Sequence, residues 1–204
     1  MNGRLVYVVG PSGAGKDSLI EFARGRLSIE DRVIFARRFI TRAPAASGEQ
    51  HVAMTPEHFM YINDLGGFSL AWEANGHRYG IGNEIRNWLS WGFQVVVNGS
   101  REYLSQVRRG FPSLVTVHIT APADLIHQRL VDRKRESPDQ IAERLRRSAA
   151  WELSNTDGVL TIVNDGNLAV AGEQLIALLR EHAIRNPIGT TIRDSSGNAS
   201  SMGS

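Results

Sequence analysis

Cysteine, lysine and long apolar runs are scarce or absent in this chain of 204 residues. It has no cysteine, which excludes a disulfide framework. No apolar run approaches the roughly 20 residues that a helix needs to cross a membrane. No basic and apolar leader precedes the first apolar segment, so no secretory signal is visible. We therefore expect a cytoplasmic protein without membrane association.

Lysine occurs only at Lys16 and Lys134, so arginine carries most of the positive charge. The planar guanidinium group can bind a phosphate through two parallel hydrogen bonds, which favours phosphorylated small molecules as ligands. The formal net charge is only +2, and the arginines are dispersed among nearly as many acidic residues. A nucleic-acid partner is therefore the weakest interpretation of the charge pattern.

A glycine-rich segment follows the apolar run Leu5–Val9 and precedes a run with helical spacing. Strand, glycine-rich loop and helix in this order form a phosphate-binding loop. The expected ATP-binding residues are Gly10, Pro11, Ser12, Gly13, Ala14, Gly15, Lys16, Asp17 and Ser18. Glycines let backbone N–H groups turn toward a polyphosphate, and Lys16 can reach its β- and γ-phosphates. The sequence thus predicts an ATP site, against the simpler alternative of a glycine turn that only caps a helix.

Asp17 departs from this motif, because Ser or Thr normally stands there and places a hydroxyl on Mg²⁺. The later strand that ends at Val97-Asn98 has no carboxylate where many phosphate-loop enzymes keep an acidic Mg²⁺ partner. Two interpretations of Asp17 stay open. It supplies that charge as a metal-site residue, or it stabilises the N-terminus of the helix that follows. We expect Mg²⁺ as a cofactor.

Strand-like and helical segments alternate along the rest of the chain, which predicts an α/β fold. The later strands are expected at residues 33–40, 93–97, 114–119 and 159–163. Helices are expected at residues 55–65, 83–91, 100–109, 123–133, 137–153 and 168–185. A phosphate loop after the first strand implies a doubly wound, five-stranded parallel sheet of the P-loop NTPase class. We expect one domain over 1–185 and a mobile tail over 186–204.

Two further parts are expected beside this sheet. Asn75-Gly76 predicts a hairpin turn inside a small acceptor-binding insertion over about residues 40–82. An arginine-rich lid is expected over about residues 133–144, where charge on a transferring phosphoryl group would be neutralised. The arginines that bracket this loop are Arg129, Arg133, Arg135, Arg144 and Arg147. The alternative is a solvated basic helix face.

These motifs resemble the guanylate kinase fold over residues 4–183. The matching parts are residues 10–16, Thr41-Arg42, Gly48-Glu49, Tyr79-Gly80, Arg133 with Arg144, and Val163-Asn164-Asp165. The resemblance implies that Asn164 and Asp165 bind ATP near the adenine, and that Lys16, Arg133 and Arg144 are catalytic.

The guanine-reading parts of that family are altered in this chain. Leu70 aligns with the glutamate that reads guanine, Arg78 with a phosphate-binding tyrosine, and Ala45 with a second acceptor-site arginine. A leucine cannot replace the hydrogen bonds of a carboxylate, so the sequence argues against guanylate as the acceptor.

The departures resemble a narrower family, the PhnN-type ribose 1,5-bisphosphate phosphokinases of phosphonate breakdown. The shared segments are Gly15-Lys16-Asp17-Ser18, Ala74-Asn75-Gly76-His77 and Val97-Asn98-Gly99-Ser100-Arg101. The resemblance implies transfer of the ATP γ-phosphate to the C1 phosphate of ribose 1,5-bisphosphate, which gives 5-phosphoribosyl 1-diphosphate. We expect this sugar phosphate to be bound by Arg38, Arg42, Arg78 and Tyr79.

Two other functions stay open beside this one. The first is a nucleoside-monophosphate kinase of shifted specificity, and the second is a non-catalytic guanylate-kinase-like module that binds a partner peptide. The intact phosphate loop with Lys16 argues against the second. His51, His58 and His77 match no metal-site spacing and are interpreted as surface or hydrogen-bonding residues. Whether the chain acts as a homodimer is left open.

Overall fold

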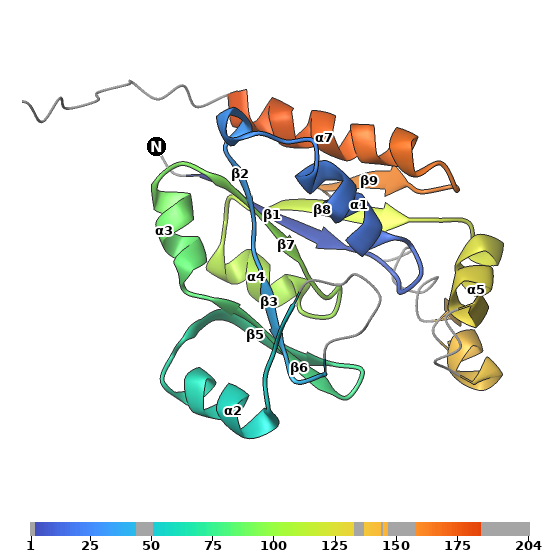
Figure 1. The fold of residues 1–204 in the computed structure, drawn as a ribbon, viewed down its shortest axis with the longest axis horizontal. Helices are drawn as coiled ribbons and strands as arrows, with labels where there is room; N and C mark the ends of the chain where they lie inside the picture. Colours follow the sequence, from blue (N-terminus) through green and yellow to red (C-terminus); the bar gives the residue numbers. More distant parts are fainter. Residues whose placement is uncertain (1–2, 44–50, 133–136, 144, 147–157, 185–204) are drawn as a thin grey trace, which may run out of the picture.

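The computed structural model describes residues 3–43, 51–132, 137–143, 145–146 and 158–184. At its centre lies a five-stranded sheet in the order β2-β7-β1-β8-β9, in which every neighbouring pair is parallel (Figure 1). The strands are β1 (Leu5–Val9), β2 (Val33–Phe35), β7 (Gln94–Asn98), β8 (Val115–Thr120) and β9 (Val159–Val163). Because β1 lies between β7 and β8, the chain winds outward on both sides of it. The predicted doubly wound, five-stranded parallel sheet is confirmed.

Helices α1 (Lys16–Arg24) and α7 (Leu168–Ile184) cover one face of the central sheet (Figure 1). Val6 and Val8 of β1 share an apolar cluster with Leu19 of α1 and Leu175 of α7. Alternate residues of a strand point to opposite faces, so these two valines define the face that α1 packs on. This packing fixes α1, and with it the loop that connects β1 to α1.

The opposite face of the central sheet packs against a second, smaller sheet and the helices α3 (Glu84–Ser90) and α4 (Leu104–Gly110). The small sheet has the order β4-β3-β6-β5. Its strands are β3 (Arg38–Ile40), β4 (His51–Ala53), β5 (Phe68–Ala74) and β6 (His77–Gly82). Tyr7 and Val97 of the central sheet share a cluster with Trp72 and Ile81 of the small one. The two sheets therefore meet through an apolar layer.

Helix α2 (Pro56–Asp64) covers the outer face of the small sheet, where Phe59 stacks on Phe68 at 4.7 Å between ring centroids. Thr55 caps this helix by accepting a hydrogen bond from the N–H of His58, as the sequence predicted. The β5–β6 hairpin turns at Asn75 and Gly76, whose φ angles of 50° and 74° are typical of a type I′ turn.

Helix α5 (Ala123–Asp132) follows β8, and residues 138–143 are also helical. Ile141 packs there against Ile126 and Leu130 of α5. The predicted lid residues 133–136 and 144, residues 147–153 of the expected helix, and the tail over 186–204 lie outside the described residues. No helix in the described part of the chain is long and apolar enough to span a bilayer.

The prediction of one strand over residues 33–40 is wrong. β2 pairs with β7 in the central sheet, whereas β3 pairs with β4 and β6 in the small sheet. The N–H of Ala36 still donates to the carbonyl of Val96 at 2.9 Å, and Arg37 is exposed where the chain crosses between the sheets. The short strand β4 was not predicted, and the helix expected from Ser100 begins at Leu104.

Candidate active site

The loop between β1 and α1 has a backbone that only glycine can adopt at two critical positions. Gly10 and Gly15 have φ angles of 151° and 88°. A Cβ atom on Gly10 would lie 2.0 Å from the carbonyl oxygen of Ile119, and one on Gly15 would lie 2.3 Å from Nδ2 of Asn164. The loop is therefore packed closely against the ends of β8 and β9, and its shape depends on both glycines.

Lys16 is the first residue of α1, and its side chain folds back over the loop. Its Nζ donates hydrogen bonds to the carbonyl oxygens of Gly10 and Pro11 at 2.8 and 2.9 Å. The ammonium group thus lies at the mouth of the loop, next to the N-terminus of α1. Both the charge and the helix terminus favour an anion at this point.

Asn164 and Arg129 hold the loop from the opposite side. Asn164, directly after β9, is buried and donates through Nδ2 to the carbonyl of Ala14 at 2.8 Å. Arg129 of α5 donates through Nη1 to the carbonyls of Gly13 and Asn164 at 3.3 and 3.5 Å. The Oδ1 atom of Asn164 is buried without a hydrogen-bond partner, so a polar acceptor remains beside the loop. Asp165, the next residue, is exposed.

Asp17 lies in the first turn of α1 and forms two contacts through one carboxylate oxygen. Its Oδ1 accepts hydrogen bonds from Nη2 of Arg38 at 2.8 Å and from Nδ2 of Asn98 at 2.7 Å. The N-cap residue is Gly15, and no side chain caps the helix. The carboxylate therefore links the phosphate loop to the end of β7 and to the small sheet, although its position in the first turn still complements the helix dipole.

Asp17 offers a carboxylate of the kind that holds Mg²⁺, whereas Asn98 turns its amide nitrogen toward that carboxylate. The carbonyl oxygen of the Asn98 side chain is buried and has no hydrogen-bond partner. Mg²⁺ is usually held by one or two carboxylates together with substrate phosphates and water. In the described part of the chain, no group of three or more His, Cys, Asp or Glu residues could hold a metal ion by itself.

The small sheet places Arg78 on a different face from Arg38 and Tyr79, two other predicted acceptor residues. Ile40 pairs with Tyr79 across β3 and β6, and both are buried against the central sheet. Arg38 shares the face of Ile40, because it lies two residues away on the same strand. Arg78 lies on the opposite face, with its Nε 3.9 Å from a carboxylate oxygen of Glu73. The structure therefore does not bring Arg78 together with Arg38, and Tyr79 stacks on Trp72 at 5.4 Å.

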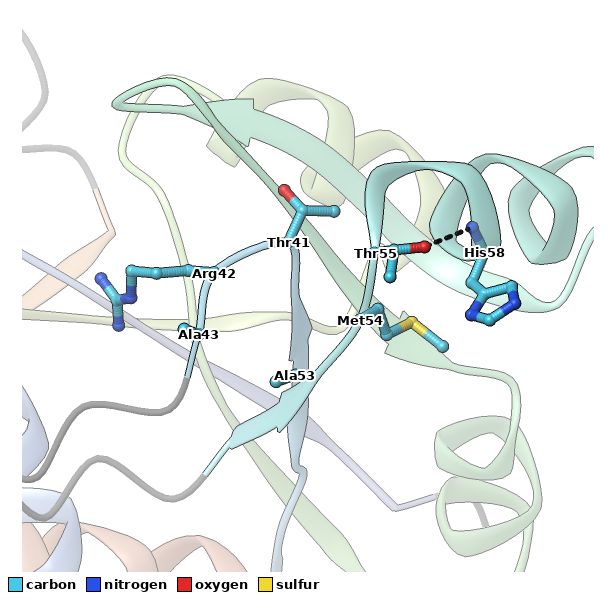
Figure 2. A pocket seen from close by; sticks show the side chains of 7 residues that line it. All are labelled: Thr41, Arg42, Ala43, Ala53, Met54, Thr55 and His58. Atoms are coloured by element: carbon cyan, nitrogen blue, oxygen red, sulfur yellow. Dashed lines mark hydrogen bonds between the residues drawn. The ribbon is translucent and has the colours of Figure 1, made fainter.

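Arg42 lines a cavity of about 400 Å³ at the edge of the small sheet (Figure 2). The other lining residues are Thr41, Ala43, Ala53, Met54, Thr55 and His58. Figure 2 shows Arg42 and His58 extending toward opposite ends of this group. A cavity of this size is in the range that holds small ligands, and none of the described residues that line it is acidic.

Comparison with known proteins places these features in a family. The ribose 1,5-bisphosphate phosphokinase PhnN of Thiobacillus denitrificans is 45% identical to the chain over 180 residues, which are 88% of this chain and 94% of that protein. The chain belongs to the PhnN family. The PhnN protein of Psychromonas ingrahamii is 43% identical over 183 residues, 90% of this chain and 93% of that protein. No protein-family model matches the chain.

The fold of this PhnN-family chain is that of guanylate kinases. The crystal structure of guanylate kinase from Anaplasma phagocytophilum superposes with a TM-score of 0.64 at 16% identity, over 90% of this chain and 87% of that chain. Leu70, which we expected from the sequence to take the position of the guanine-reading glutamate, is only 3% exposed and packs between the two sheets. Its side chain therefore belongs to the apolar layer.

Sequence reasoning did not assign Asn98, His51 or His77 a place in the site of this PhnN-family protein, and it expected Arg129 beside the lid, whereas Arg129 contacts the phosphate loop. A signal existed for Asn98, since it is a polar residue at the carboxyl end of a buried parallel strand. The two histidines gave no such signal, because their contacts depend on how the small sheet is paired. Arg133 and Arg144 lie outside the described residues.

Proposed function

We propose that the chain transfers the γ-phosphate of ATP to the C1 phosphate of ribose 1,5-bisphosphate, which yields 5-phosphoribosyl 1-diphosphate and ADP. The observation that carries this proposal is the 45% identity to a protein named as this phosphokinase, over 94% of that protein's length. The PhnN name also places the reaction in phosphonate breakdown. ATP and Mg²⁺ are its proposed cofactors, a sugar phosphate its partner, and the cytoplasm its proposed location.

The phosphate loop would bind the triphosphate of ATP. Residues 10–18 offer backbone N–H groups and the N-terminus of α1, and Lys16 exchanges its contacts with Gly10 and Pro11 for phosphate oxygens. Asn164 and Asp165 would border the adenosine end, since Asn164 lies beside the loop and keeps a buried acceptor atom. The loop thereby orients the γ-phosphorus toward the small sheet.

Asp17 would hold the magnesium ion, and Asn98 would orient the carboxylate of Asp17 through its amide nitrogen. When held there, the ion would supply positive charge to offset the negative charge that develops on the phosphates during transfer. Asp17 also fixes Arg38, so one carboxylate connects the nucleotide side of the site with the acceptor side.

Arg38 and Arg42 would bind the phosphates of the acceptor. Arg38 extends from β3 to Asp17 at the start of α1, which supports a role for its guanidinium group in binding the phosphate that accepts the transfer. Arg42 would hold the more distant part of the sugar phosphate next to the cavity. Tyr79 supports this side of the sheet through Trp72. Arg78 points to the other face, so we do not assign it to the phosphate that Arg38 binds.

The reaction itself requires positioning and neutralisation of charge. An oxygen of the C1 phosphate forms a bond to the γ-phosphorus while the bond to the bridging β–γ oxygen breaks, and ADP leaves. The acceptor oxygen is already anionic at neutral pH, so no side chain needs to remove a proton. Arg133 and Arg144 are proposed to close over the transferring group as the lid.

An assay of ADP release tests this proposal with a panel of acceptors. Ribose 1,5-bisphosphate should give the highest kcat/KM, and GMP or dGMP should be poorer by orders of magnitude, because the buried Leu70 offers no hydrogen bond to a base. A clear preference for any nucleoside monophosphate would reject the proposal. Failure of the intact protein to bind ATP in calorimetry would favour the non-catalytic module.

A further inference from the structure

The Thr41-Arg42 turn continues β3 past the end of its sheet. The N–H of Thr41 donates to the carbonyl of Arg78 at 3.0 Å, and the hydroxyl of Thr41 accepts from the N–H of Arg78 at 2.8 Å. On the other side, the N–H of Met54 donates to the carbonyl of Ile40 at 3.0 Å. These bonds complete the sheet at its edge, and the next residue along the chain is Arg42.

Two histidines add hydrogen bonds to the backbone carbonyl groups of the turn. Nδ1 of His77 lies 3.1 Å from the carbonyl oxygen of Thr41, and Nε2 of His51 lies 3.2 Å from the carbonyl oxygen of Arg42. A carbonyl can only accept, so each of these ring nitrogens carries the proton. The bonded atoms are thus Nδ1–H in His77 and Nε2–H in His51.

The two imidazoles come from opposite sides of β3. In the small sheet β3 lies between β4 and β6; His51 is the first residue of β4, and His77 is the first residue of β6. The type I′ turn sets His77 opposite Ala74, and the parallel pairing sets His51 beside Arg38. Both rings are partly buried, so their donors are held in place before any ligand arrives.

We propose that His51 and His77 are positioning residues that fix the backbone beneath Arg42 for acceptor binding. This inference rests on the proposed function, in which Arg42 binds the sugar phosphate. Arginine has a long side chain with many rotamers, and a turn held on both sides reduces the conformational freedom that must be lost on binding. Neither histidine contacts the transferring phosphate, so its loss should weaken acceptor binding more than it slows the chemical step.

Matched substitutions can distinguish the effect of losing the hydrogen-bond donor from the effect of losing the imidazole ring. In His77→Asn an amide nitrogen replaces Nδ1, and in His51→Gln an amide nitrogen replaces Nε2, whereas His77→Leu and His51→Leu remove the donor. Each leucine variant should raise KM for ribose 1,5-bisphosphate about three- to tenfold, the loss expected for one hydrogen bond. KM for ATP should stay unchanged and kcat should stay within about twofold. The Asn and Gln variants should keep most of the wild-type KM.

A double-mutant cycle with Arg42→Ala distinguishes positioning from a general structural role. If the histidines act through Arg42, His77→Leu should have little further effect on KM in the Arg42→Ala background, and thermal unfolding of each variant checks that it is folded. An unchanged KM in His77→Leu and His51→Leu, or an equal effect in both backgrounds, would overturn the inference. A wild-type protein that does not use ribose 1,5-bisphosphate would instead reject the proposed function and this inference with it.

Discussion

Lys16 has the clearest role of any single residue, because its amine lies between the carbonyls of Gly10 and Pro11 at the mouth of the loop. Lys16→Ala should lower kcat by about two to three orders of magnitude, the loss typical of a removed transition-state contact. Lys16→Arg should not restore the rate, since a planar guanidinium cannot occupy the place of a compact ammonium group. Coupled ADP-release kinetics measure both variants. Near-normal activity of Lys16→Ala, with an unchanged circular dichroism spectrum, would remove Lys16 from the mechanism.

Asp17 is the residue at which the loop departs from its motif, and Asn98 stands opposite it at 2.7 Å. Many phosphate-loop enzymes keep a carboxylate at the end of a neighbouring strand, whereas this chain has one on the loop. We therefore expect the negative charge to matter more than which of the two positions, 17 or 98, carries it. Asp17→Asn should raise the Mg²⁺ concentration needed for ATP binding in calorimetry and for activity, with partial recovery at high Mg²⁺.

The double variant Asp17→Ser with Asn98→Asp is the matched control for this prediction. It returns the hydroxyl to the loop and moves the carboxylate to the strand, so its Mg²⁺ curve should lie closer to wild type than that of Asp17→Asn. If Asp17→Asn does not change how activity depends on the Mg²⁺ concentration, Asp17 is not a metal ligand. Its role would then be limited to its contacts with Arg38 and Asn98 and to its position at the start of α1.

At the scale of elements, one ion pair joins α7 to the short helix at Ile29–Asp31. Nε of Arg180 donates to Oδ1 of Asp31 at 2.9 Å, and the N–H of Ser28 donates to the other oxygen. The hydrogen bond from Arg180, followed by that from Ser28, lowers the pKa of Asp31 below its ordinary value. The unfolded chain therefore binds a proton at Asp31 more tightly than the folded chain does. The ion pair stabilises the fold at pH values above the ordinary pKa of an aspartate, and this stabilisation is lost as the pH falls through the lowered pKa of the folded state.

Arg180→Gln should therefore lower the melting temperature at pH 7, and the difference from wild type should shrink below about pH 4. Thermal unfolding across that pH range measures the effect. Arg108→Gln, which removes an exposed arginine of α4, is the control and should show no such pH dependence. A difference that stays constant from pH 7 to pH 3 would contradict the ionic origin of the contact.

The lid is the element whose role comes from sequence alone, since Arg133 and Arg144 lie outside the described residues. Arg133→Ala and Arg144→Ala should lower kcat by about two orders of magnitude and change acceptor KM much less, because lid arginines act mainly on transition-state charge. Arg146→Ala is a matched control, since that side chain is exposed and pairs with Glu143. Effects confined to acceptor KM would place these arginines in the acceptor site.

At the scale of the whole molecule, the sequence predicted the central sheet because its strands are short apolar runs that alternate with amphipathic helices. It also predicted the edge that carries the phosphate loop, since ligands bind at the carboxyl ends of parallel strands. It could not predict that the chain changes sheets at Ala36 and Arg37, because both strands read as one apolar run. No local sequence pattern specified the register of the strands in the small sheet. This register decides on which face Arg78 lies and which groups His51 and His77 contact.

The central claim concerns one new bond, and ³¹P NMR of the product tests it most directly. With ATP, Mg²⁺ and ribose 1,5-bisphosphate, the account predicts two coupled diphosphate signals on C1 beside an unchanged phosphate monoester on C5. Lys16→Ala is the control that should leave the substrate spectrum as it was. A diphosphate on C5 with the C1 monoester intact, or no diphosphate product while GMP is converted to GDP by the same protein, would contradict it.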